Sequence, residues 1–314
     1  MNDSRGEAIL VHLASGIGNI VLATPLLRVL DRAGFVVDVL LDADYAGVGA
    51  LFEDWSAVRC VYEGRHGRPS ESAYAVSLIA VPPSHWKRYA LRHTRARRTQ
   101  YRPPDELFFQ DEQAYYLDFA RTLGCDISDP PHYFLPVTPE ICDIVGPTTL
   151  AVAPGCKTGA MAAKRWPFFP ELAERFDDIV LVGTDDDLTR FDGTYMHFPS
   201  HVRSLVGRLS LRETAAVLAG AGAVVANDCG LGHVAGALGV PTILLFGPTP
   251  HVPLGRLPPN VTILRTGLEC EPCWRASRYA ACEGRIDCLK QLSVMTVVAA
   301  VCQIIPAARS GLMP

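Results

Sequence analysis

The N-terminal half of the chain alternates short, almost wholly apolar runs with longer stretches of mixed polarity. Continuous apolar runs of this length are typical of strands that are covered on both faces, and the stretches between them have helical character. Gly34 directly precedes one of the apolar runs and marks the end of a helix. Strands are expected over 8–14, 35–42, 57–64 and 74–81, and helices over 24–34 and 112–124.

A second series of the same kind follows the breaker-rich stretch PVTPEICDIVGPT at 136–148. Strands are expected over 148–155, 178–184, 223–228 and 241–247, and helices around 169–176, 211–221 and 233–239. Strands that alternate with helices indicate βαβ units and parallel sheets. The sequence therefore predicts an α/β protein with two doubly wound, Rossmann-like domains, 1–140 and 148–314, that face each other across a cleft.

Composition agrees with two well-packed domains and narrows the classes of partner. The chain has 314 residues, of which 49% are hydrophobic and 20% charged. A net charge of −4 argues against a general binder of nucleic acid or of membrane surfaces. The sequence shows no secretory signal and no apolar stretch of about 18 residues that could span a bilayer, so a cytoplasmic protein that is not an integral membrane protein is expected.

One basic stretch departs from this acidic balance. Residues 85–102 read HWKRYALRHTRARRTQYR. This stretch is interpreted either as a solvated helix face or as a patch for an anionic acceptor, whereas nucleic-acid binding is disfavoured by its short length and by the charge of the whole chain.

The first of three glycine-containing turns is GIGNIVLATP at 16–25. It follows a predicted strand and opens a helix, so Gly16 and Gly18 would let the backbone approach a ligand at a helix N-terminus. Val21 occupies the third glycine position of a dinucleotide fingerprint, which that motif therefore does not support. The alternative is a tight turn without a ligand.

The other two turns carry titratable groups. In APGCKTGAMAAKRWP (153–167), Lys157, Lys164 and Thr158 suit a phosphate, although solvated lysines are the plainer interpretation. In NDCGLGHVAGALGV (227–240), the glycines expose a helix N-terminus whose partial positive charge suits a diphosphate. The plainer alternative there is a capping Asp228 and a packed His233. The three turns together predict a site for a nucleotide diphosphate.

These segments resemble glycosyltransferase family 9, the bacterial heptosyltransferases. The similarity includes APGCKTGAMAAKRWPFFPELAERF, NDCGLGHVAGALGVPTILLFGPTP, the opening GIGNIVLATPLLRVL and the cysteine-containing CEPCWRASRYAACEGRIDCLKQLSVMTVVAAV. The resemblance implies the GT-B fold, with an acceptor in the N-terminal domain and a nucleotide sugar mainly in the C-terminal one. It implies inverting transfer from a nucleoside-diphosphate sugar, typically ADP-L-glycero-D-manno-heptose, to an acceptor glycan, protein or small molecule, with no metal needed for the chemistry.

The resemblance also implies roles for particular residues. Lys164 falls on the lysine that holds the donor phosphate, and Asp185 or Asp187 lies near the place where the family contacts the ribose or sugar. Gly18 and Asn19 fall on the acceptor-binding opening. The expected donor-binding set is Gly155, Thr158, Lys164, Asp185, Asp228, Cys229, Gly230, Leu231, Gly232 and His233.

Two positions depart from the family pattern. Asn19 stands where the family has the Asp that serves as general base, and a neutral amide cannot take a proton from an acceptor hydroxyl. His12, Asp105 and Glu106 are candidates for a substitute base, and a catalytically silent sugar-nucleotide binder or assembly protein is the alternative function. Cys229 replaces a Ser or Thr hydroxyl, which predicts altered contact with the donor.

Four cysteines lie within nineteen residues, at Cys270, Cys273, Cys282 and Cys288. Four thiolates suit a structural Zn²⁺ or iron ion, and relatives carry similar cysteines. A packed loop with free thiols is the alternative. In either case the cluster is expected to hold the C-terminal loop without touching the sugar.

Overall fold

The computed structural model describes residues 6–43, 45, 47–63, 69, 73–81, 111–138, 144–273, 282 and 285–305. The basic stretch 85–102, Asp105 and Glu106 lie outside the described residues. The chain divides into two compact units. Unit 1 comprises Met1–Val137 and Val252–Pro258, and unit 2 comprises Thr138–His251 and Pro259–Pro314.

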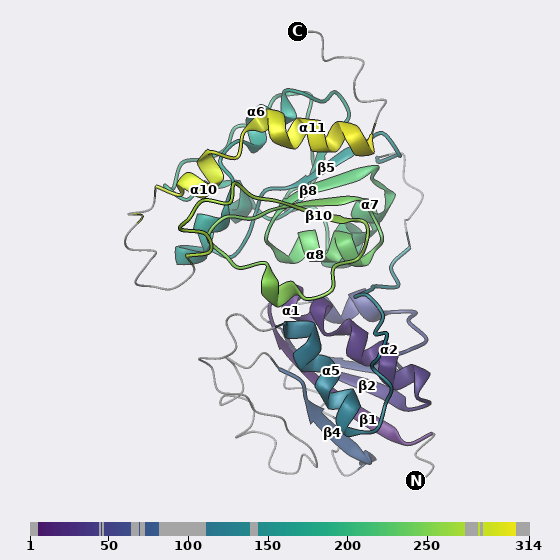
Figure 1. Ribbon diagram of the computed structural model, residues 1–314. Helices are drawn as coiled ribbons and strands as arrows, with labels where there is room; N and C mark the ends of the chain where they lie inside the picture. Colours follow the sequence, from purple (N-terminus) through teal and green to yellow (C-terminus); the bar gives the residue numbers. More distant parts are fainter. Residues whose placement is uncertain are drawn as a thin grey trace. The chain divides into compact units, whose positions relative to one another are not determined.

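Unit 1 is built on a four-stranded parallel sheet with the order β3-β2-β1-β4 (Figure 1). The elements are β1 (Ala8–Ser15), α1 (Ile17–Leu22), α2 (Thr24–Arg32), β2 (Val36–Ala43), the 3-10 helix η1 (Val48–Phe52), β3 (Cys60–Glu63), β4 (Val76–Ile79), α5 (Glu112–Thr122) and the 3-10 helix η6 (Val252–Leu254). The strands and helices predicted from the pattern of apolar runs are therefore present in this unit.

A short return of the chain completes unit 1. The segment Val252–Pro258 belongs to this unit although it follows β9 in sequence. Gln113 on α5 is buried and donates hydrogen bonds to the carbonyl oxygens of Leu254 and Arg256. Because a buried amide needs partners, Gln113 holds this segment in place.

Unit 2 has a six-stranded parallel sheet with the order β10-β9-β8-β5-β6-β7. The elements are β5 (Leu150–Ala153), the 3-10 helix η4 (Gly159–Lys164), α6 (Phe169–Ala173), β6 (Ile179–Leu181), the 3-10 helix η5 (Asp185–Leu188), β7 (Arg203–Ser204), α7 (Leu211–Gly220), β8 (Ala223–Asn227), α8 (Gly230–Ala237), β9 (Thr242–Leu245), β10 (Val261–Leu264), α10 (Asp287–Lys290) and α11 (Val294–Ile304). Numbered from β5, this is the 3-2-1-4-5-6 order of dinucleotide-binding folds.

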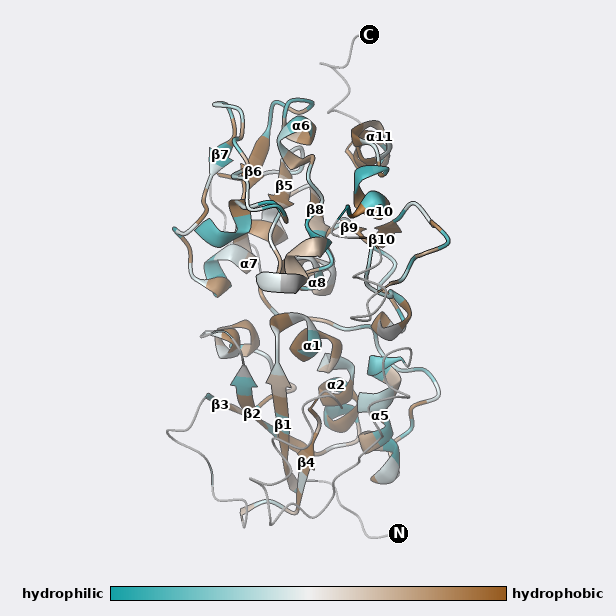
Figure 2. Cartoon of the chain, turned by 90° about the vertical axis from the view of Figure 1, so that its left-hand side faces the viewer, coloured by the Kyte–Doolittle hydropathy of each residue, from teal (hydrophilic) through white to brown (hydrophobic). Residues whose placement is uncertain are grey.

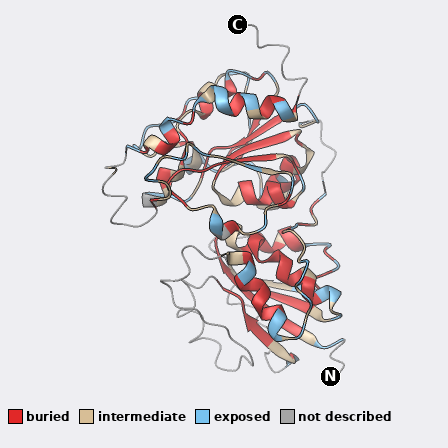
Figure 3. Cartoon of the chain, in the orientation of Figure 1, coloured by how far each residue is buried: buried red, intermediate tan, exposed pale blue. Residues whose placement is uncertain are grey.

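Helices cover both faces of the unit 2 sheet, with α7 and α8 on one face and α6 and α11 on the other (Figure 1). The strands β5, β8 and β9 are buried at every position, as expected for central strands of a covered parallel sheet. Figure 2 shows β5 and β8 as hydrophobic, and Figure 3 shows the strands of both units as largely buried. The predicted α/β class with two parallel sheets is confirmed.

The described part of the chain contains no helix that is both long enough and apolar enough to cross a membrane.

Candidate functional site

Each sheet has one point at which the strand order reverses. In unit 1 the chain runs from β1 to β2 and β3 on one side, while β4 pairs with the other side of β1. In unit 2, β6 and β7 lie on one side of β5, and β8, β9 and β10 lie on the other. Ligands of such sheets bind beyond the carboxyl ends of the strands at this reversal. The three glycine-containing turns follow β1, β5 and β8, so all three lie at such a point in their own unit.

Four polar side chains meet at the turn after β8, Asp228 and His233 from that turn and its helix, Lys164 from the loop after β5 and Thr249 from the loop after β9. They are named here the Asp228 cluster. Lys164 Nζ donates to Asp228 Oδ2 at 2.9 Å, and Thr249 Oγ1 donates to the same oxygen at 2.8 Å. His233 Nε2 lies 3.3 Å from Asp228 Oδ1. The side chains of Lys164 and Asp228 are 11% and 13% exposed, so the ion pair is largely withdrawn from water.

The two charges of this pair stabilise each other. Burial alone would raise the pKa of the Asp228 carboxyl, but the charge of Lys164 and the hydrogen bond with His233 bring that pKa well below its usual value. Burial would likewise lower the pKa of Lys164, and the neighbouring Asp228 carboxylate raises it above its usual value instead. The pair is therefore charged across the neutral pH range. The Asp228 carboxylate thus contacts the side chains of three other residues, Lys164, His233 and Thr249.

The helix that follows this turn starts very close to the sheet. Cys229 is the N-cap of α8 and makes no side-chain capping bond. A Cβ on Gly232 would come within 2.5 Å of Leu244 Cδ2 and 3.1 Å of the Ala226 Cβ, so only glycine lets the helix approach the strands this closely. Burial raises the pKa of the Cys229 thiol to about 12, and this side chain is therefore a neutral thiol. Gly230 and Leu231 are half-buried, and His233 is 4% exposed.

The turn after β5 is shaped by an aspartate from the next loop. A Cβ on Gly155 would lie 2.0 Å from Asp187 Cγ, so Asp187 occupies the space that any side chain at 155 would need. Asp187 also accepts from the backbone N–H of Thr184 at 2.8 Å. Asp185 is exposed and lies beside Gly207, and Thr158 is exposed as well. Of the two candidate aspartates, Asp187 is the one that contacts the β5 turn.

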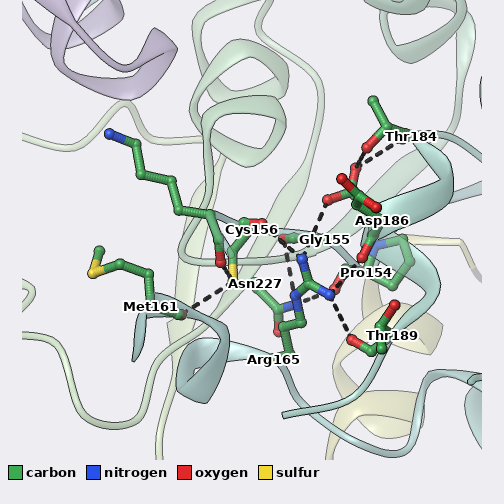
Figure 4. Close-up of polar contacts among 11 residues, drawn as sticks. Pro154, Gly155, Cys156, Met161, Arg165, Thr184, Asp186, Thr189 and Asn227 are labelled. Carbon is green, nitrogen blue, oxygen red and sulfur yellow. Dashed lines mark hydrogen bonds and ion pairs between the residues drawn. The ribbon is translucent and has the colours of Figure 1, made fainter. Parts of the chain in front are cut away.

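Two residues that the sequence reasoning did not select hold these turns together (Figure 4). Arg165 is 3% exposed, and its guanidinium donates to the carbonyl oxygens of Asp186 and Thr189 at 2.6 Å and of Cys156 at 2.9 Å. Asn227 accepts from the backbone N–H of Trp166 at 2.9 Å and donates to the carbonyl of Pro154.

These positioning contacts cross-link three loops of unit 2, those after β5, β6 and β8. For Arg165, Asn227 and Thr249, the signal available in the sequence is that each lies next to, or within, a motif already selected. Arg165 directly follows Lys164, Asn227 directly precedes Asp228, and Thr249 lies in the FGPT segment.

The turn after β1 in unit 1 carries a second polar group, named here the Asn19–Glu112 pair. Ser15, at the end of β1, is buried and has a φ of 84°, a left-handed conformation that is uncommon outside glycine. Gly16 caps α1, and Gly18 and Asn19 are half-buried in its first turn. Asn19 Nδ2 donates to Glu112 Oε1 at 2.9 Å and to Glu112 Oε2 at 3.2 Å.

Glu112 is the first residue of α5, and its carboxylate also accepts from the hydroxyl of Tyr116 at 2.6 Å. Sequence reasoning did not select it, although it opens the helix predicted over 112–124. His12, the described candidate for a substitute base, is 2% exposed on β1 and its Nε2 lies 3.3 Å from Asp42 Oδ2. The structure thus places a carboxylate against Asn19, and that carboxylate belongs to Glu112.

The four clustered cysteines are free thiols. Cys273 and Cys288 are buried, Cys282 is half-buried and Cys270 is exposed. Within the described ranges, no group of three or more His, Cys, Asp or Glu side chains is placed to hold a metal ion. The described thiols therefore do not form the expected four-ligand site, and metal binding stays a prediction from the spacing.

Comparison with known proteins supports the C-terminal motifs in particular. The family glycosyltransferase family 9 (heptosyltransferase) matches residues 139–282. A lipopolysaccharide heptosyltransferase 1 of Pseudomonas aeruginosa is 49% identical over 70 residues, which are 22% of this chain and 20% of that protein. A lipooligosaccharide heptosyltransferase 2 of Haemophilus influenzae is 32% identical over 126 residues, 37% of this chain and 36% of that protein. The chain thus aligns with about a third or less of the length of these relatives.

Solved structures extend the likeness of the fold to almost the whole chain. A glycosyl transferase family 9 protein from Veillonella parvula matches with a TM-score of 0.72 at 18% identity, over 96% of this chain and 98% of that one. The ADP-heptose lps heptosyltransferase II of E. coli matches with a TM-score of 0.69 at 19% identity, over 96% of this chain and 100% of that one. E. coli heptosyltransferase WaaC with ADP matches with a TM-score of 0.63 at 19% identity, over 94% of this chain and 99% of that one. The fold is that of the GT-B heptosyltransferases.

Proposed function

We propose that this chain is a member of glycosyltransferase family 9, whose model matches residues 139–282, and an inverting glycosyltransferase that uses a nucleoside-diphosphate sugar such as ADP-heptose. The observation that carries the proposal is the Asp228 cluster. It lies at the strand-order reversal of unit 2 and falls inside the segment that matches the family. The donor sugar is assigned from the relatives, one of which is described as a complex with ADP.

In this proposal the loops after β5 and β8 hold the nucleotide diphosphate. The ammonium of Lys164 neutralises phosphate charge, and the N–H groups of the first turn of α8 donate to phosphate oxygens. As the bond from the anomeric carbon to the diphosphate breaks, negative charge grows on the leaving group. Preorganised donors in a site withdrawn from water stabilise that charge at little reorganisation cost.

Asp228 has a positioning role in the same proposal. Its carboxylate fixes Lys164 and is itself held by His233 and Thr249, so the ammonium is oriented before the donor arrives. His233 Nδ1 is buried and has no hydrogen-bond partner among the described residues. A hydroxyl or phosphate oxygen of the donor would satisfy that nitrogen.

Unit 1 is proposed to bind the acceptor through the turn that contains Gly18 and Asn19, and the acceptor is a glycan, protein or small molecule. No step of the transfer uses a metal ion. A Zn²⁺ or iron ion on the four cysteines would act on the stability of the C-terminal loop alone.

Titration calorimetry with ADP and ADP-heptose tests the donor site directly. Micromolar to submillimolar binding of both is expected, and Lys164→Ala should weaken it at least tenfold because it removes a charge-assisted contact. Lys290→Ala, which removes an exposed lysine of the same unit, is the matched control and should leave binding unchanged. The absence of any binding at millimolar ligand would overturn the proposal.

A catalytically silent binder is the alternative that Asn19 raised. It would bind ADP-heptose and release no ADP, whether water or a sugar serves as the acceptor. The carboxylate of Glu112 favours the transferase, because it supplies an acid-base group directly beside Asn19.

A further inference from the structure

We propose that Glu112 is the general base of the transfer, in place of the carboxylate that the family pattern expects at position 19. The inference rests on the proposed function and concerns a residue on a different element from the family's opening motif. Its basis is the contact between Asn19 and Glu112, which joins residues 93 positions apart in sequence.

The geometry places the Glu112 carboxylate next to the position of the missing one. The Asn19 amide nitrogen reaches both carboxylate oxygens, at 2.9 Å and 3.2 Å, so Glu112 lies within one hydrogen bond of the side chain at 19. Both residues are half-buried and thus retain surface that a substrate can contact. Asn19 lies in the first turn of α1 and Glu112 is the first residue of α5, so helical backbone fixes both positions.

Electrostatics explains why position 19 has an amide when position 112 has a carboxylate. Two carboxylates about 3 Å apart cannot both be ionised, because like charges at that distance raise the pKa of one of them strongly. An Asp at 19 would therefore conflict with Glu112. Asn19 keeps the size and the polarity of Asp, removes the charge and donates a hydrogen bond to the remaining carboxylate.

Two further features beside Glu112, the Tyr116 hydroxyl and the N-terminus of α5, also favour its ionised form. The Tyr116 hydroxyl donates to it at 2.6 Å, and Tyr116 is 1% exposed. Burial, together with the nearby Glu112 charge, raises the pKa of Tyr116 well above its usual value, so this side chain stays a donor. The N-terminal turn of a helix adds a partial positive charge beside its first residue. An ionised carboxylate is the form that a general base requires.

The proposed step needs only the acceptor, the donor and Glu112. The acceptor hydroxyl gives its proton to the Glu112 carboxylate while its oxygen forms a bond to the anomeric carbon of the donor. The bond from that carbon to the diphosphate oxygen breaks with its electron pair, and the nucleoside diphosphate leaves. Neither Asn19 nor Tyr116 changes its protonation state, and both act as positioning residues.

The test uses the full chain, ADP-heptose as donor, and ADP release as the readout, with water and with deacylated lipopolysaccharide core as acceptors. Glu112→Gln removes the basic group at nearly constant shape. It is expected to lower kcat by about 10²- to 10⁴-fold, the usual contribution of a general base, and to leave the calorimetric Kd for ADP unchanged. Asp118→Asn, which removes another carboxylate from α5, is the matched control and should stay within twofold of wild type.

The paired exchange Asn19→Asp/Glu112→Gln restores one carboxylate beside one amide. At least tenfold higher kcat than for Glu112→Gln alone is expected, which a loss through misfolding could not produce. Asn19→Asp alone creates two adjacent carboxylates and is expected to give no gain over wild type.

Four results would count against the assignment. Full activity of Glu112→Gln, or a large gain for Asn19→Asp alone, would overturn the role of Glu112. Binding of ADP-heptose by the wild type with no ADP release to either acceptor would also overturn it, and would leave the donor site standing. Absence of ADP-heptose binding would overturn the proposed function itself, and the inference with it.

Discussion

The Asp228 cluster and the Asn19–Glu112 pair both follow a central strand at the strand-order reversal of their sheet. They differ in the groups that contact the carboxylate. In unit 2 the carboxylate of Asp228 is matched by the ammonium of Lys164, and both are largely buried. In unit 1 the carboxylate of Glu112 accepts hydrogen bonds from the neutral side chains of Asn19 and Tyr116, among its contacts, and it is half-buried. The first arrangement suits a fixed binding surface, and the second suits a group that must accept a proton.

The difference has a physical cause. A cationic partner lowers the pKa of a carboxylate strongly, which makes it a weak base, whereas neutral hydrogen-bond donors lower it less. Asp228 has a pKa well below the usual value for this reason, and it is therefore suited to orient Lys164 and not to take a proton. The three experiments below test this contrast from the side of unit 2, where the charges are cross-linked.

The largest effect is expected from breaking the buried ion pair. Lys164→Met leaves the charge of Asp228 without its partner, and the stability to guanidinium denaturation should fall by about 3–5 kcal/mol. Adding Asp228→Asn removes the stranded charge and keeps a partner for Thr249, so the double variant should recover most of that loss. Arg285→Met breaks an exposed ion pair of the same unit, with side chains 60% and 43% exposed, and should cost no more than about 1 kcal/mol. Equal losses for both single variants would show that burial of the Lys164–Asp228 pair is not decisive.

A smaller loss of stability is expected when the Arg165 guanidinium, which joins the loops, is replaced by an ammonium. Arg165→Lys keeps the charge, but a single ammonium cannot reach three carbonyl oxygens that a planar fork contacts. A loss of about 2 kcal/mol is expected, the size of one charged hydrogen bond. Arg208→Lys at an exposed position is the control, and an unchanged midpoint of denaturation for Arg165→Lys would contradict the positioning role.

The smallest effect is expected from mild acid. The pKa of Asp228 is lower in the folded protein than in the unfolded chain, where it is near 3.9. The unfolded state therefore binds more protons in acid. The stability that Asp228 contributes is complete above about pH 5 and is lost as the pH falls through 4 and below.

Denaturation midpoints measured between pH 6 and pH 3 check this sign. The wild type should lose stability more steeply than Lys164→Met/Asp228→Asn, which lacks the titrating carboxylate. Parallel curves would mean that Asp228 does not have a depressed pKa in the folded protein.

Much of the architecture could be read from the chain. The apolar runs predicted the central strands, since a strand buried on both faces has no polar position to interrupt it. The short edge elements Arg203–Ser204 and Val261–Leu264 were not predicted, because exposed or half-buried strands lack that signal. The three turns were found because glycine and titratable residues concentrate at the ends of strands.

Within the candidate site, the sequence marked Lys164, Asp228 and His233, whose functional roles stay proposals. It did not mark Glu112, Arg165 or Thr249, which have the composition of ordinary helix, loop and turn residues. A search from Asn19 outward along the chain leads to His12, whose imidazole lies beside Asp42 on the neighbouring strand. The separation of Asn19 and Glu112 in the sequence does not predict that their side chains are in contact.

The order of apolar and polar residues by itself determined that this protein has two series of βαβ units and where their glycine-containing turns lie, because each strand and helix is specified by its own local pattern. Only the tertiary structure decided which side chains meet at those turns. The contact of Asn19 with Glu112, and that of Lys164 with Asp228, depend on how helices and loops distant in sequence pack at the ends of the strands. Local sequence patterns do not specify that packing.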